Sequence, residues 1–220
     1  MKNIVLFGSS GHATVIADII EKEGLYNILG LIDTNQPTGT NCSGHEVLGS
    51  DEELPQLIEK HNVEGGIIAV GDNWIRHSIA QKILKLIPDF IFFKAIHPSA
   101  QIANQVNLKR GTVVMAGAVI NSGSEIGEFC IVNTKSSIDH DNFFADYSSI
   151  MPNAATGGNV KVGEFSALGM GASILHQVQI GKHSVIGAGS VVLNNVEDHS
   201  VVYGSPARLQ KIREAGESYL

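Results

Sequence analysis

Histidine and cysteine are the side chains best suited to chemistry near neutral pH, and this sequence has nine of the first and two of the second. Cys42 and Cys130 lie far apart in a chain for which no signal peptide is expected, so we predict two reduced thiols without a catalytic role. Six histidines fall in polar segments typical of a protein surface and receive no role: His45, His61, His77, His97, His183 and His199. His12, His140 and His176 remain to be explained.

A second feature with chemical potential is the turn Gly8-Ser9-Ser10-Gly11, which follows an apolar run and precedes a helix-like segment. Small residues at the start of a helix let backbone N–H groups approach an anion. The turn lacks the lysine of a phosphate-binding P-loop and is not G-x-G-x-x-G, so dinucleotide binding is not expected. Taken alone, an ordinary turn is the better interpretation.

Strand-like and helix-like segments alternate over the first ninety residues and must position these side chains. Apolar runs and helix-like segments follow one another over 4–7, 13–22, 28–32, 51–60, 66–70 and 75–87. Strand then helix, repeated, predicts a parallel sheet with crossover helices. Ser50 with Glu53 is a capping-box pattern, and Asp72 or Asn73 would cap the next helix. Residues 1–90 therefore predict a small α/β domain.

Composition narrows the possible partners. The chain is 43% apolar and 17% charged, with a formal net charge of -7. An acidic balance argues against nucleic acid or an anionic membrane as partner, and no stretch approaches the roughly 18 apolar residues that span a bilayer. We expect a cytoplasmic protein that holds any anionic substrate locally.

The second half repeats with a period of six. Sixteen of seventeen positions spaced by six from Ile96 to Val192 are apolar, Thr156 being the exception, and a small or β-branched residue follows most of them by four positions, Asn142 being the one poor fit. This pattern predicts a solenoid whose short strands each point one aliphatic side chain inward. Glycines directly after an inward aliphatic are expected to form tight backbone corners, namely Gly127, Gly163, Gly169, Gly181 and Gly187.

Such hexads resemble the left-handed parallel β-helix of the hexapeptide-repeat acyltransferases. The resemblance implies a β-helix domain over residues 91–203, followed by a polar, helix-prone tail over 204–220. His140 and His176 are 36 residues apart; with three hexads per turn, they lie about 9.6 Å apart, at roughly 4.8 Å per stacked strand. One zinc ion, with bonds of about 2.0 to 2.1 Å to nitrogen, cannot bridge that distance within a chain. A carbonic anhydrase-like zinc site built between subunits stays open as an alternative.

Further motifs extend the resemblance to the whole chain. They are Gly8-Ser9-Ser10-Gly11-His12-Ala13, Gly30-Leu31-Ile32-Asp33, Ala69-Val70-Gly71-Asp72-Asn73 with Arg76, Asn133, His140 and Gly157-Gly158-Asn159-Val160. Together they are similar to the nucleotide-sugar N-acetyltransferases of bacillosamine and related 4-amino-sugar biosynthesis, whose relatives include sialic acid O-acetyltransferases. The resemblance implies a Rossmann-like domain in which the glycine turn meets the phosphates and sugar of the substrate and the end of the second strand reads the nucleotide base. The implied substrate-binding residues are Gly8, Ser10, Gly11, His12, Asp33, Asn35, Asp72 and Asn73.

The resemblance also assigns the chemistry. It implies that His140 is the general base that takes the amine proton during direct attack on the thioester, with Asp141 orienting the ring, Asp139 as the competing partner and Asn133 near the acceptor sugar. Strict strand alternation would point Asp141 away from His140, unless a solenoid corner breaks it. Where relatives often have a second histidine, this chain has Ser149.

Acetyl-CoA is the implied cosubstrate, with no metal, and it would lie in a groove between neighbouring solenoids of a homotrimer. Its implied contacts are the Gly158 amide, Ser149, Ala188, Lys161, Lys182 and Arg208. We therefore predict an N-acetyltransferase acting on the 4-amino group of a nucleotide-linked 4-amino-4,6-dideoxy sugar, with a UDP-sugar favoured, for surface-glycan biosynthesis. The alternatives are O-acetylation of a sialic or nonulosonic acid, the zinc enzyme, and a non-enzymatic scaffold.

Overall fold

The computed structural model describes residues 1–219 and divides into two compact units. The first contains Met1–Gly71 and Ile75–Pro98, and the second contains Asp72–Trp74 and the chain from Ser99 onward. Within residues 1–219, no helix is both long and apolar enough to cross a membrane.

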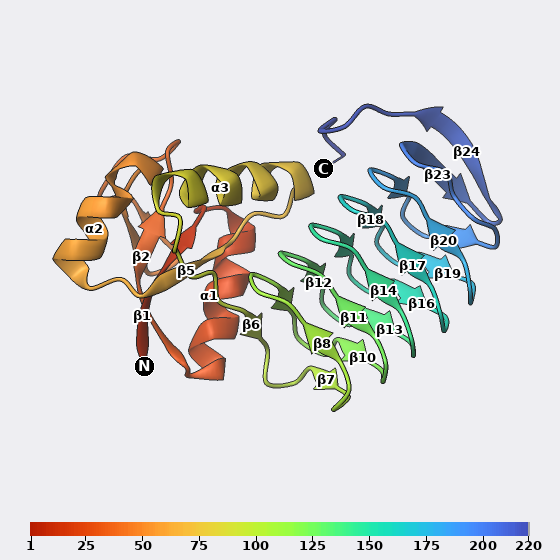
Figure 1. Ribbon diagram of the computed structural model, residues 1–220, viewed down its shortest axis with the longest axis horizontal. Helices are drawn as coiled ribbons and strands as arrows, with labels where there is room; N and C mark the ends of the chain where they lie inside the picture. The colour runs from red at the N-terminus through yellow and green to blue at the C-terminus, as the bar shows by residue number, and fades with distance from the viewer. Residues whose placement is uncertain (220) are drawn as a thin grey trace. The chain divides into compact units, whose positions relative to one another are not determined.

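The first unit is an α/β sheet domain, as the alternating pattern predicts (Figure 1). Its elements are β1 (Lys2–Phe7), α1 (Gly11–Glu23), β2 (Tyr26–Ile32), β3 (Asn41–Cys42), β4 (His45–Gly49), a 3-10 turn (Asp51–Glu53), α2 (Leu54–His61), β5 (Gly65–Ile68), α3 (Asn73–Leu86, whose first two residues belong to the second unit) and β6 (Ala95–Ile96). The sheet order is β3-β4-β2-β1-β5, and β1 pairs in parallel with both β2 and β5. The hairpin of β3 and β4, an antiparallel addition at the sheet edge, was not anticipated from the sequence.

Both predicted helix starts are confirmed. The Glu53 carboxylate accepts a hydrogen bond from the Ser50 backbone N–H at 2.7 Å, which completes the capping box before α2. The Asp72 carboxylate accepts one from the Trp74 N–H at 2.9 Å, so Asp72 caps the first turn of α3.

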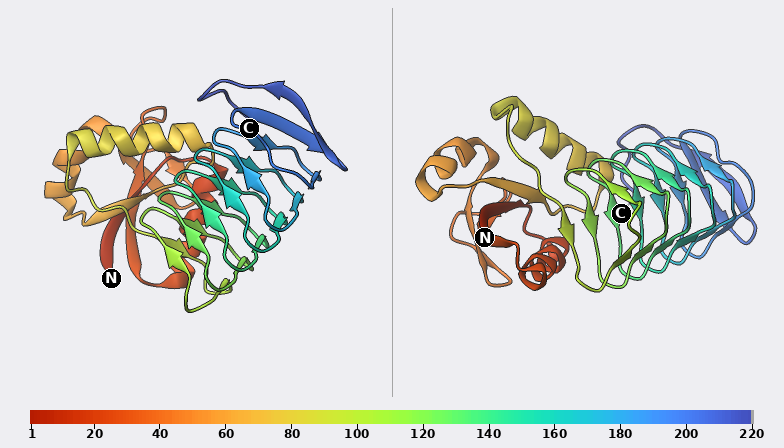
Figure 2. Two further views of the ribbon diagram at one scale, coloured as in Figure 1. Left: turned by 45° about the vertical axis from the view of Figure 1, so that its right-hand side comes forward. Right: turned by 60° about the horizontal axis from the view of Figure 1, so that its bottom comes forward.

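The second unit is the predicted solenoid, and each hexad forms one two-residue strand (Figure 2, right). The strands are β7 (Gln101–Ile102), β8 (Asn107–Leu108), β9 (Val113–Val114), β10 (Val119–Ile120), β11 (Glu125–Ile126), β12 (Ile131–Val132), β13 (Ser137–Ile138), β14 (Phe143–Phe144), β15 (Ser149–Ile150), β16 (Ala155–Thr156), β17 (Lys161–Val162), β18 (Ala167–Leu168), β19 (Ser173–Ile174), β20 (Gln179–Ile180), β21 (Val185–Ile186) and β22 (Val191–Val192). Each strand from β7 to β19 pairs in parallel with the strand three further on, so one coil takes 18 residues. The inward positions form the core: Ile120, Ile138 and Ile186 are completely buried.

The predicted role of the five glycines is wrong. None of Gly127, Gly163, Gly169, Gly181 and Gly187 has a positive φ. The left-handed residue lies two positions later in each hexad, as at Phe129 (φ 54°) and Phe165 (φ 59°). The glycines are needed for close packing instead, because a Cβ on Gly169 would lie 2.3 Å from the Ile186 carbonyl oxygen of the next coil.

The expected surface location of His183 is also wrong. His183 is buried and stacks on Phe165 at 4.7 Å and on His199 at 4.9 Å between ring centroids. The stack continues through Tyr147 to Phe129. All five rings sit at left-handed positions 18 or 16 residues apart, so successive coils place them one above another. The polar residues beside these rings gave no sign of the stack in the sequence, because the rings meet only when each coil closes.

The predicted helical tail is wrong as well. After β22, the chain forms β23 (Ser200–Gly204), which pairs in parallel with β21, and then β24 (Ala207–Ile212), which pairs antiparallel with β23. The last solenoid strands leave unpaired backbone groups at a sheet edge, and a hairpin satisfies them where a helix would not.

Candidate active site

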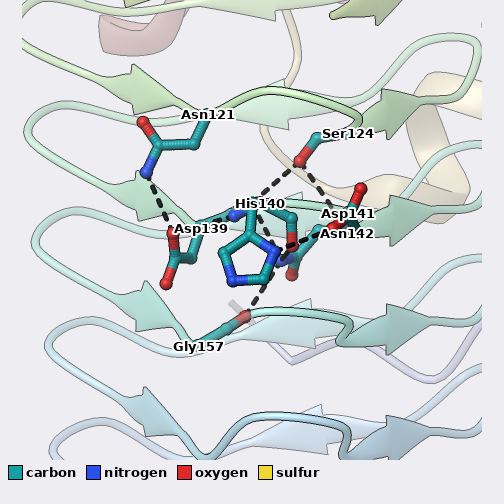
Figure 3. A network of polar contacts seen from close by, with 7 residues as sticks. All are labelled: Asn121, Ser124, Asp139, His140, Asp141, Asn142 and Gly157. Carbon is teal, nitrogen blue, oxygen red and sulfur yellow. Dashed lines mark hydrogen bonds and ion pairs between the residues drawn. The ribbon is translucent and has the colours of Figure 1, made fainter.

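His140 lies at the corner where the chain leaves β13 and turns into β14. Asp141 adopts the left-handed conformation there (φ 57°), which breaks the alternation of side chains and brings its carboxylate back to the imidazole. His140 Nδ1 and Asp141 Oδ2 are 2.8 Å apart (Figure 3). This hydrogen bond, with a smaller contribution from the charge of Asp139, raises the pKa of His140 above its ordinary value of 6.5.

Asp139 holds the backbone of the corner rather than the ring. Its Oδ1 accepts hydrogen bonds from the His140 backbone N–H at 2.8 Å and from Asn121 Nδ2 at 3.0 Å. These two bonds, the one from Asn121 first, lower the pKa of Asp139. Of the two aspartates that the sequence left in competition, the structure therefore pairs Asp141 with the imidazole.

The far edge of the imidazole lies against Gly158, one coil further along the chain. A Cβ on Gly158 would lie 2.5 Å from His140 Nε2, so only glycine leaves room for the ring. The solenoid itself does not require glycine there, because equivalent positions hold Ala116, Glu128 and Met170. Gly158 thus makes room for the His140 ring. In the sequence, this contact is indicated by the spacing of 18 residues, one coil, between the two positions.

The backbone amide of Gly158 is available to a ligand. Within the described part of the chain, its N–H donates no hydrogen bond to another residue. The Gly157 carbonyl of the same planar peptide unit accepts a hydrogen bond from Asn142 Nδ2 at 2.9 Å, so the Gly158 N–H points the opposite way, away from Asn142. His140 and Gly158 both line one open pocket of about 440 Å³, together with Asp139, Gly157, Asn159, Ile174, Leu175, His176 and Gln177.

The remaining residues predicted for acetyl-CoA lie outside this pocket. Lys161 contributes to a hollow of about 350 Å³ beside Phe143 and Gln179, and Arg208 to an apolar hollow of about 330 Å³ beside Leu193 and Leu209. Ala188 and Lys182 are exposed elsewhere on the solenoid and line neither the His140 pocket nor these two hollows.

Asn133 and Ser149 are not brought to His140 within one chain. Asn133 lies at the corner that enters β13, and its Oδ1 accepts the Thr134 N–H at 2.8 Å. Ser149 begins β15, in a different sheet from β13 and β14, and is 4% exposed. Its hydroxyl donates to Asn73 Oδ1, while Asn73 Nδ2 donates to the carbonyls of Phe165 and Ser166.

The first unit holds a separate pocket of about 570 Å³ at the carboxyl ends of β1 and β2, lined by the predicted Gly8, Ser10, Asp33 and Asn35. Gly8 has φ 107° and lies against Val70, so the turn needs its conformational freedom. Ser9 donates its hydroxyl to Asp33 Oδ2 at 2.5 Å, which ties the turn to the end of β2. This pocket at the start of α1 can accept an anionic group.

Other residues predicted to bind the substrate are placed differently. Gly11, His12, Asp72 and Asn73 are not among the residues that line the 570 Å³ pocket. His12 is held neutral, because burial, and then the charge of Arg76, lowers its pKa to about 4. The lining also includes an ion pair that the sequence did not indicate, Lys82 Nζ to Asp51 Oδ2 at 3.1 Å.

Metal-binding side chains do not gather in either unit: among residues 1–219, no three of histidine, cysteine, aspartate and glutamate lie close enough together to hold an ion. Cys42 and Cys130 are free thiols. The solenoid pocket brings together the His140 imidazole and the Gly158 amide.

A solenoid of hexads with a histidine at one corner, joined to an α/β domain, defines a hexapeptide-repeat transferase. Residues 3–83 match the PglD N-terminal domain family, and residues 159–194 match the bacterial transferase hexapeptide family of six repeats. A solved structure of a histidine-to-asparagine variant of perosamine N-acetyltransferase from Caulobacter crescentus, in complex with CoA and GDP-perosamine, is 33% identical, with a TM-score of 0.89 over 96% of this chain and 98% of that one.

Two further relatives agree. The acetyltransferase domain of PglB from Neisseria gonorrhoeae, in complex with acetyl coenzyme A, is 31% identical, with a TM-score of 0.87 over 95% of this chain and 99% of that chain. The curated UDP-N-acetylbacillosamine N-acetyltransferase of Bacillus subtilis (strain 168) is 35% identical over 117 residues, and the match spans about half of each protein, 53% and 52%. The chain belongs to this family of hexapeptide-repeat sugar N-acetyltransferases.

Proposed function

We propose that the protein transfers an acetyl group from acetyl-CoA to the 4-amino group of a nucleotide-linked 4-amino-4,6-dideoxy sugar, with His140 as general base. The observation that carries the proposal is the contact of His140 Nε2 with Gly158, whose N–H in the same pocket donates to no other residue among 1–219. A base and a hydrogen-bond donor that line the same pocket are what attack of an amine on a thioester requires.

In the proposed reaction, the amine nitrogen attacks the thioester carbonyl carbon while His140 Nε2 accepts the proton that the nitrogen loses. The Asp141 carboxylate, 2.8 Å from Nδ1, orients the ring and stabilises the imidazolium that forms. The Gly158 N–H donates to the carbonyl oxygen as its negative charge develops. Collapse breaks the carbon–sulfur bond, and the thiolate of CoA takes the proton from His140, so no covalent enzyme intermediate is needed.

We propose that the nucleotide part of the substrate binds the 570 Å³ pocket, with its phosphates at Gly8 to Ser10. The N–H groups at the start of α1 favour such an anion. The resemblance in the sequence favours a UDP-sugar, while one solved relative is bound to GDP-perosamine, so both nucleotides belong in the test. A role in surface-glycan synthesis in the cytoplasm is part of the same proposal.

A homotrimer is also part of the proposal, with acetyl-CoA between neighbouring solenoids. Asn133 lies outside the His140 pocket of its own chain, so it can act there only from a second copy, whereas the buried Ser149 hydroxyl is already bonded to Asn73. Light scattering should give three times the monomer mass, and a monomer with full activity would contradict this part.

The decisive experiment incubates the protein with acetyl-CoA and a panel of UDP-, GDP- and dTDP-linked 4-amino sugars, plus a sialic acid, and follows the mass gain of one acetyl group. Replacing His140 with Ala or Asn should lower kcat by roughly 10² to 10⁴ fold with little change in the KM for acetyl-CoA. His61→Asn, which removes an imidazole at the end of α2, is the matched control and should retain full activity. Retained turnover in the His140 variants would refute the assigned base, and acetylation of sialic acid alone would identify an O-acetyltransferase.

A further inference from the structure

The residue that fits the repeat least well lies directly behind the proposed catalytic corner. Asn142 occupies the small inward position four residues after Ile138 and is 1% exposed. Equivalent positions are filled by small or β-branched residues, including Thr112, Ala118, Ser124, Cys130, Ser136, Ser148, Ala154, Val160, Ser166, Ala172, Val178, Ser184 and Ser190. A buried amide at this one position therefore calls for a reason other than the fold.

Several hydroxyl residues at this position make the same hydrogen bond to the next coil. Ser124, Ser166 and Ser184 donate to the carbonyl oxygen fifteen, fifteen and thirteen residues further on, at 2.8, 2.6 and 2.8 Å. Asn142 makes the same bond, from Nδ2 to the Gly157 carbonyl at 2.9 Å. In this respect a serine would serve the solenoid equally well.

Serines elsewhere in the repeat make a different bond from the same position, as Ser136 and Ser148 do by donating to the carbonyl three residues earlier, both at 2.7 Å. A hydroxyl has one proton to donate, whereas the Asn142 amide has two N–H groups and makes these contacts together. Its Nδ2 also lies 2.9 Å from the Asp139 carbonyl oxygen and 3.1 Å from the His140 carbonyl oxygen (Figure 3). One amide group thus holds both peptide units that flank the Cα of His140, and with the Gly157 carbonyl it also holds the peptide unit that contains the Gly158 N–H. The base and the hydrogen-bond donor of the proposed reaction are fixed by the same side chain.

The arrangement has a cost, which argues for a function. Within residues 1–219, the Asn142 Oδ1 is buried without a hydrogen-bond partner, and a buried polar atom left unpaired is unfavourable. A serine or alanine would avoid that cost. Buried polar groups that weaken the fold are found where geometry must be held for chemistry.

We infer that Asn142 is a positioning residue, which sets the distance and orientation of the His140 imidazole relative to the Gly158 amide. The inference rests on the proposed function, because it needs His140 and Gly158 to be the groups that react. Asn142 itself lies behind the corner and is not among the residues that line the pocket.

Asn142→Ser is the sharpest test, since it restores the repeat but leaves one O–H donor, which can hold only one of the Gly157, Asp139 and His140 carbonyls at a time. We expect kcat to fall at least tenfold, the KM for acetyl-CoA to stay within twofold, and the melting temperature to stay level or rise. Asn142→Ala, which leaves no donor for any of the three carbonyls, should lose more. Ser184→Ala is the matched control, because it removes the corresponding bond seven hexads away and should lower stability without changing kcat.

An NMR titration of His140 gives a readout that does not depend on turnover. If Asn142 holds the corner, the pKa of His140 in Asn142→Ser should move down towards 6.5, because the hydrogen bond to Asp141 is then formed less of the time. Wild-type kcat together with an unchanged titration would overturn the inference. If the wild-type protein acetylates no amino sugar, the proposed function fails, while the titration still decides whether Asn142 positions the ring.

Discussion

A methyl group at position 158 should disable His140 without disturbing the fold. Gly158 does not have a positive φ, and other residues occupy equivalent positions of the repeat, so alanine is compatible with the backbone. Its Cβ would lie 2.5 Å from His140 Nε2 and 2.6 Å from Cε1, whereas ordinary contacts begin near 3.4 Å. The ring must therefore move by about 0.9 Å.

A displacement of about 1 Å can cost about 10² fold in rate, or about 2.7 kcal/mol in the activation free energy. The His140 side chain is 56% exposed and can swing into solvent, so the melting temperature should change little. We expect Gly158→Ala to lower kcat about a hundredfold, with the KM for acetyl-CoA retained, in an assay that follows release of the CoA thiol at saturating substrates.

The double variant Gly158→Ala with His140→Ala identifies the cause. If the methyl group acts through the ring, it should have almost no further effect once the ring is absent, so the two losses will not add. Full additivity would mean that Gly158 contributes independently of His140. A kcat within twofold of wild type for Gly158→Ala alone would refute the contact as a determinant of activity.

Two predictions concern pH. The hydrogen bond that His140 donates to Asp141 raises the pKa of His140, and the base must be neutral to act, so kcat should rise with pH through a value above 6.5. Asp141→Asn should shift this rise to lower pH, and a profile that does not move would contradict the pairing. His12 has a folded-state pKa of about 4 against 6.5 unfolded, so unfolding takes up a proton and stability is lost as pH falls from 6.5 towards 4. The loss should be about 3 kcal/mol at pH 4 by denaturant titration, and an equally steep loss in His12→Gln would contradict this origin.

The period of six determined most of the solenoid in advance. An aliphatic residue at every sixth position can be buried only if the chain turns at the same interval, and each predicted inward position is the second residue of a strand. In the first ninety residues, the apolar runs placed β1, β2 and β5, and Ser50 and Asp72 placed two helix starts, while the β3–β4 hairpin was missed. Both are local patterns, which a reader of the sequence can recognise without knowing what packs against them.

What the tertiary structure decided concerns residues that meet only because a coil closes after 18 positions. The stack from Phe129 to His199, the Gly158 backbone beneath His140 and the reach of Asn142 to Gly157 all join successive coils. Asp141 rather than Asp139 is the partner of the imidazole because Asp141 itself adopts the left-handed conformation, which the alternation of side chains along a strand does not predict. The six-residue period and the polarity of each position can be read from the sequence. Contacts between coils depend instead on the direction of the side chains at each corner, and the backbone torsions fix that direction only once the coils have stacked.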